Sequence, residues 1–137
     1  MNAKVMPRSE LKHACLGLLD RAAVEHPCGH QGKLAARYII RSASEERIEL
    51  MFEKGDKSKA NLWITRNHAQ GLLDTGIEFR DYPASSLYQE SEPGQARPYG
   101  RHAALKPMRG LARADLVRFT VERAEEMELI LGSLAAI

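Results

Sequence analysis

The spacing of apolar residues along the chain switches between helical and strand-like, and each switch marks an expected element. Between residues 9 and 26 apolar side chains recur every three or four positions, which predicts a helix with Ser9 as its N-cap and Pro27 at its end. Residues 37–41 and 47–53 then form an expected hairpin, because apolar and polar side chains alternate in the second run. The first part of the chain therefore predicts one helix followed by two antiparallel strands.

The middle and the end of the chain add further strands and two more helices. Residues 61–65 and 77–80 alternate as strands do, and a short helix over residues 67–73 lies between them. Alternation returns at residues 116–121, and helical spacing follows from about residue 122. The acidic first turns of this last helix suit the positive end of the helix dipole.

The predicted order of elements is α-β-β-β-α-β-(long loop)-β-α. Short connections between strands favour antiparallel pairing. A chain of 137 residues with 44% hydrophobic and 28% charged residues is long enough, and ordinary enough in composition, to bury a core. We therefore expect a single α+β domain over residues 1–137, with a five-stranded, mostly antiparallel sheet whose helices cover one face.

One long segment, residues 83–113, fits neither spacing. Four prolines and three glycines interrupt it, and no alternation runs through it. Irregular loops longer than about 12–15 residues are uncommon in compact domains, and most are functional or disordered. This loop is therefore the first place to look for a site.

The charge distribution supports the same choice. The net charge is only +2, yet residues 97–113 contain no acid, whereas residues 122–128 carry four glutamates. Guanidinium groups bind phosphate oxygens, an aromatic ring can stack on a base, and glycine lets the backbone approach a phosphate. The sequence therefore predicts a small binding module that contacts a phosphate-bearing partner, nucleic acid in the first place. The predicted binding residues are Arg97, Tyr99, Arg101, His102, Lys106, Arg109 and Arg113.

Other interpretations of this loop stay open. Tyrosine and arginine are enriched at protein interfaces, so the same residues would suit a protein-interaction domain. His102 could act as a general acid or base in a metal-independent ribonuclease. The arginines could also be merely solvated, or paired with the glutamates of the last helix. The sequence leaves open whether the protein is an enzyme, and it favours binding over catalysis.

A second cluster raises the question of a metal. His26, Cys28 and His30 are ligand types that zinc favours. Their alternate spacing is not that of a usual zinc site, and a turn that ends the first helix accounts for them. We therefore expect no metal and no cofactor. Gly-rich nucleotide-binding loops and a GxSxG nucleophile motif are also absent from the sequence.

Two features bear on location. The two cysteines are too few for a disulfide framework. The first residues do not resemble a signal peptide, and no apolar run approaches the roughly 18 residues that span a bilayer. We therefore expect a cytoplasmic protein that makes no membrane contact.

Overall fold

The structure is a computed structural model, and it describes residues 7–30, 32–87 and 99–137. Within these residues six strands form one antiparallel sheet in the order β1-β2-β3-β4-β6-β5. The strands are β1 (Val24–Glu25), β2 (Ala35–Arg41), β3 (Arg47–Glu53), β4 (Asn61–Thr65), β5 (Glu78–Tyr82) and β6 (Leu116–Thr120). The predicted α+β class and mostly antiparallel sheet are confirmed.

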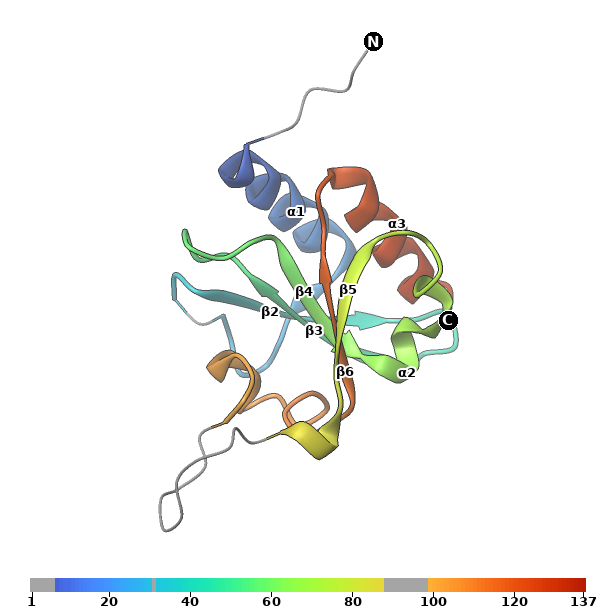
Figure 1. Cartoon of the computed structure of the whole chain (residues 1–137). Coiled ribbons are helices and arrows are strands. Elements are labelled where there is room, and N and C mark those ends of the chain that lie inside the picture. The colour runs from blue at the N-terminus through green and yellow to red at the C-terminus, as the bar shows by residue number, and fades with distance from the viewer. Residues whose placement is uncertain (1–6, 31, 88–98) are drawn as a thin grey trace.

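The two long helices lie side by side on one face of the sheet, as predicted (Figure 1). They are α1 (Arg8–Ala22) and α3 (Ala124–Ala135), and a short helix α2 (Arg66–Ala69), continued by the turn η1 (Gln70–Leu72), follows β4. Alternation in β3 turns every second side chain toward these helices, which makes that face apolar. The side chains buried between helices and sheet include Cys15, Leu19, Phe52, Phe119 and Ile130.

The first helix differs from its prediction at both ends. It begins at Arg8, and Pro7 precedes it without a side-chain cap, so Ser9 lies in the first turn rather than at the cap. It ends at Ala22, because the next residues turn extended and Val24 pairs with Ile39 of β2. This pairing gives the backbone of residues 24–26 partners that a longer helix would have to supply. It also adds the sixth strand, where the sequence predicted five.

Burial of the Cys15 thiol predicts unequal reactivity of the two cysteines. Cys15 is on the buried face of α1 and is fully buried, whereas Cys28 is exposed. Burial raises the pKa of Cys15 to about 12, so at pH 8 its reactive thiolate form is almost absent. We expect a thiol reagent at pH 8 to modify one cysteine of the native chain rapidly, and both only in denaturant. Rapid modification of Cys15 in the native state, identified by peptide mass, would contradict this packing.

The opposite face of the sheet is covered by residues 99–115, the second half of the loop predicted over residues 83–113 (Figure 1). This segment contains the turn η3 (Ala103–Leu105) and stays irregular elsewhere, while the first half contains the turn η2 (Ala84–Ser86). Three of its side chains, Leu105, Met108 and Leu111, are fully buried against the sheet. The segment is therefore a packed third layer of the domain, which we call the covering layer.

Polar side chains of the sheet fasten this layer. Arg37 Nε donates to the carbonyl oxygen of Ala104 at 2.8 Å, and a carboxylate oxygen of Glu49 accepts the Gly110 N–H at 3.0 Å. A Cβ on residue 110 would lie 3.0 Å from Glu49 Oε2, so a side chain there would push the carboxylate away. Two charged side chains that this sheet face buries, Arg37 and Glu49, thus bind the backbone of the layer above it.

The outer edge of the sheet at β5 is strongly charged. Among the strands of the described residues β5 pairs only with β6, so within this part of the chain its other side has no strand partner. Glu78, Arg80 and Asp81 are exposed on this strand, and Asp81 forms an ion pair with Arg66.

Candidate functional site

Arg101, one of the predicted ligand-binding residues, is a buried part of the fold. Its side chain is 8% exposed. Its guanidinium donates to the carbonyl oxygens of Tyr82 at 2.6 Å and of Leu111 and Ala112 at 3.3 Å. These bonds join the end of β5 to the covering layer, so both terminal nitrogens of the Arg101 guanidinium are bound within the chain itself.

Tyr99 and His102 also have roles within the layer. The Tyr99 hydroxyl donates to the carbonyl oxygen of Ala112 at 2.7 Å. His102 Nδ1 accepts the N–H of Ala104 at 3.1 Å and so caps η3. This cap occupies one ring nitrogen of the residue considered for ribonuclease chemistry.

The remaining predicted residues are more open. Lys106, Arg109 and Arg113 are exposed, and the Lys106 amine lies 5.5 Å from the centre of the Tyr99 ring. They line none of the cavities described below. Arg97 lies outside the described residues. A binding role for these four residues stays a prediction.

The candidate metal ligands His26, Cys28 and His30 are held apart by structural contacts. Nδ1 of His26 accepts the Cys28 N–H at 3.1 Å, and Nδ1 of His30 accepts the Arg37 N–H at 3.0 Å. Each Nε2 faces a carboxylate, that of Glu49 at 3.2 Å for His26 and that of Glu25 at 3.1 Å for His30. Among the described residues no three metal-ligating side chains cluster together. The histidines instead pin the turn between β1 and β2.

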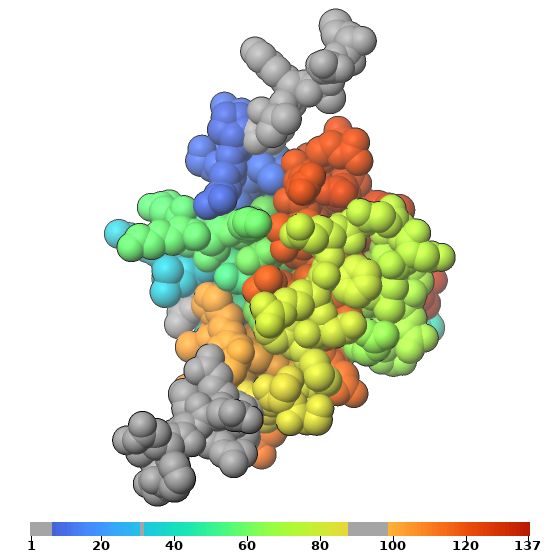
Figure 2. All heavy atoms as spheres, in the orientation of Figure 1, coloured from blue at the N-terminus to red at the C-terminus, as the bar shows by residue number. Residues whose placement is uncertain are grey.

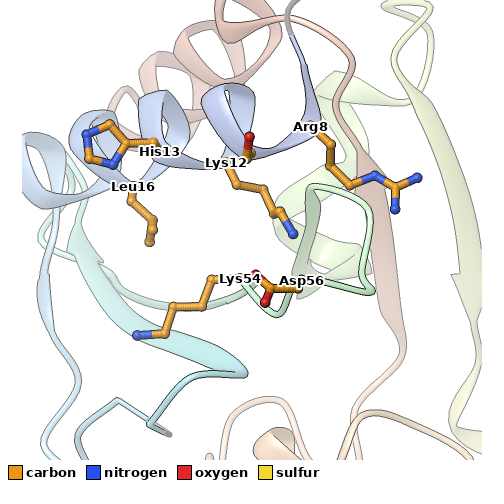
Figure 3. Close-up of a pocket in the computed structure, with 7 residues that line it drawn as sticks. Arg8, Lys12, His13, Leu16, Lys54 and Asp56 are labelled. Carbon is orange, nitrogen blue, oxygen red and sulfur yellow. The ribbon is translucent and has the colours of Figure 1, made fainter.

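A different set of cations gathers where α1 meets the turn between β3 and β4. In Figure 2 the blue atoms of α1 stand next to the green atoms of this turn. A cavity of about 580 Å³ between them is shown in Figure 3, and a second of about 710 Å³ adjoins it through Lys54 and Asp56. We call the two together the basic groove. The basic side chains lining it are Arg8, Lys12, His13, Lys33, Lys54 and Lys57.

Lys12 anchors this groove. It is 6% exposed and points toward the turn between β3 and β4 (Figure 3). Its amine donates to the carbonyl oxygens of Gly55 and, at 3.1 Å, Ser58. The bonds fasten α1 to the β3–β4 turn and bring a positive charge into a site that water screens poorly. Lys12 belongs to none of the ion pairs among the described residues.

The other cations of the groove are also uncompensated. Arg8, Lys33, Lys54 and Lys57 form no ion pair with any carboxylate in the described part of the chain. Asp56 is the one acid among the described residues that line the two cavities. Like charges brought together without partners repel one another, and a bound anion relieves that repulsion. The arrangement can therefore hold an anion with several negative charges.

Sequence reasoning missed this groove because its parts are distant along the chain. Arg8 and Lys12 are one helical turn apart, and the turn at residues 54–59 holds Lys54, Lys57 and Lys59. Both signals are visible in the sequence, but only the packing of α1 on the sheet brings them together.

Comparison with known proteins adds no assignment. No family model, no curated protein and no solved structure matches this chain. Across residues 7–30, 32–87 and 99–137, no helix combines the length and apolar character that a membrane crossing requires.

Proposed function

We propose that this protein is a binding module for a phosphate-bearing partner, nucleic acid in the first place, and that the basic groove is its main contact surface. The observation that carries the proposal is the set of basic side chains around two adjoining cavities, with a single carboxylate among the lining residues that the structure describes. Phosphate groups spaced along a nucleic-acid strand match a row of lysine and arginine side chains.

The lining of the groove also indicates how it recognises its partner. In the described part of the chain, no tyrosine, tryptophan or phenylalanine lines the groove. Stacking of unpaired bases needs such rings, whereas contact with the phosphate backbone does not. We therefore expect affinity that depends strongly on salt and weakly on base sequence.

Charge reversal in the groove tests the proposal. The double variant Lys54→Glu/Lys57→Glu should bind a fluorescent duplex of about 20 base pairs at least about tenfold more weakly at roughly 50 mM salt. The slope of log affinity against log salt concentration should fall by about two, because each lost phosphate contact removes about 0.9. Fluorescence anisotropy across a salt series measures both quantities.

A matched control separates the groove from the covering layer. Arg109→Glu/Arg113→Glu changes the net charge by the same amount and alters two exposed side chains elsewhere. We expect it to weaken binding less than about threefold, since only the general field of the protein changes. If Arg109→Glu/Arg113→Glu weakened binding more than Lys54→Glu/Lys57→Glu, the binding site would instead lie in the covering layer, as the sequence predicted. No binding of DNA or RNA by the unmodified chain would end the proposal.

A further inference from the structure

Three side chains at the other end of β4 form a hydrogen-bonded series. Thr65 Oγ1 lies 2.7 Å from His68 Nδ1, and His68 Nε2 lies 2.7 Å from Glu46 Oε1. Thr65 ends β4, His68 belongs to α2, and Glu46 lies in the turn between β2 and β3. Three separate elements therefore bring a hydroxyl, an imidazole and a carboxylate into contact.

The order of these groups is that of an activated nucleophile. When Nδ1 accepts a hydrogen bond from the hydroxyl, the neutral ring carries its proton on Nε2, and this N–H can donate to Glu46. Both short contacts are satisfied by this one tautomer. An imidazole held by a carboxylate and bonded to a hydroxyl is the arrangement that makes serine or threonine nucleophilic.

Capping of α2 accounts for only part of this geometry. Thr65 Oγ1 caps the helix by accepting the His68 N–H at 3.4 Å, which is a long hydrogen bond. A cap needs neither the 2.7 Å bond to the ring nor a carboxylate on the far nitrogen. The imidazole is 13% exposed, so Glu46 holds it in a partly desolvated position.

The three groups open onto a cavity of about 420 Å³, within the range of small-molecule sites. Its other lining residues are polar or small, and they include Arg66, Asn67 and Asp115. Asn67 supplies a side-chain amide donor to this lining, and such donors stabilise negative charge on an oxygen. The Arg66 guanidinium in the same lining is paired with Asp81. The cavity thus suits a small, polar substrate.

We propose that Thr65, His68 and Glu46 form an acyl-transfer site for small polar carboxylic esters. Thr65 Oγ1 forms a bond to the ester carbonyl carbon while its proton passes to His68 Nδ1. The carbon–oxygen bond to the alcohol breaks, and His68 returns the proton to the departing oxygen. Water then attacks the acyl-threonine, again through His68, and releases the acid. Glu46 is a positioning residue that holds the ring and stabilises its charged form.

This site is independent of the basic groove, because the two lie at opposite ends of β4. Binding of nucleic acid and ester hydrolysis can therefore fail separately.

Covalent labelling of the full chain is the most direct test. Diisopropyl fluorophosphate should form a phosphorus–oxygen bond at Thr65 with loss of fluoride, and peptide mass spectrometry locates the adduct. Thr75 is the matched control, because its hydroxyl donates to the Leu72 carbonyl at 2.7 Å and has no imidazole partner. We expect Thr65 to be labelled and Thr75 to stay unmodified. Labelling of other residues alone, or of none, overturns the proposal.

Hydrolysis of p-nitrophenyl acetate by variants tests the roles. His68→Ala should lower the rate at least about 100-fold, the usual contribution of a general base, and should abolish labelling. Thr65→Ser keeps both the cap and the hydroxyl, so it should retain activity even if Thr65→Ala fails to fold. Glu46→Gln should lower kcat and leave KM unchanged, which a purely structural role would not do. Equal activity of Thr65→Ser and a folded Thr65→Ala would refute the nucleophile.

Discussion

Leu105→Ala should lower the free energy of unfolding by about 2–5 kcal/mol, the range for a large-to-small change in a packed core. Leu105 is fully buried between the covering layer and the sheet, in a cluster with Trp63, Met108 and Leu111. Removing its side chain leaves a cavity that a layer held on several sides cannot close. Urea unfolding followed by circular dichroism gives the free energy directly.

The neighbouring residue supplies the control for this prediction. Lys106 lies in the same turn with an exposed side chain, so Lys106→Ala should change stability by no more than about 0.5 kcal/mol. If Leu105→Ala left the free energy of unfolding equally unchanged, residues 99–115 would be a loop resting on the surface. The interpretation of this segment as a third layer would then be wrong.

Arg101→Ala should cost about 3 kcal/mol of stability, because hydrogen bonds to a charged group contribute more than neutral ones. The three carbonyl oxygens that Arg101 binds come from Tyr82, Leu111 and Ala112. Without the guanidinium they lose a donor at a place where little water enters. Thermal unfolding of the variant, compared with the original chain, measures the loss.

Arg113→Ala is the matched control for Arg101→Ala. Its side chain is exposed in the same segment, so the variant should stay within about 0.5 kcal/mol of the original chain. Arg101→Lys tests the geometry, because one ammonium cannot span three carbonyls as a planar guanidinium does. If Arg101→Ala were as stable as the original chain but bound nucleic acid more weakly, Arg101 would be a ligand-binding residue, as the sequence predicted.

The sheet could be predicted because its signal is local. Alternation in residues 47–53 puts Ile48, Leu50 and Phe52 on one face, and all three are buried beneath the helices. β1 escaped prediction, since two residues carry no period of their own and depend on their pairing with β2.

The covering layer was harder to predict because proline and glycine hid its pattern. Leu105, Met108 and Leu111 recur every three residues, a regular apolar stripe within a segment that otherwise reads as loop. The basic residues around them drew attention to surface chemistry. A guanidinium that binds carbonyl groups inside the fold and one that binds a ligand look the same in a sequence.

The candidate sites depend on contacts between distant segments. The basic groove joins residues 8–13 to residues 54–58, and the Thr65–His68 pair gains its carboxylate from Glu46. Periodicity reports which face a residue occupies but not which remote residue it meets. Each site therefore became visible only with the packing.

The charged rim of β5 bears on how the chain behaves when molecules crowd together. Two copies meeting edge to edge in an antiparallel register centred on residue 80 would set Arg80 against Arg80. Like charges directly opposite one another weaken such pairing. This repulsion opposes association between molecules at β5, the last strand of the sheet within the described residues. The same strand that closes the sheet thus opposes its continuation into a fibril.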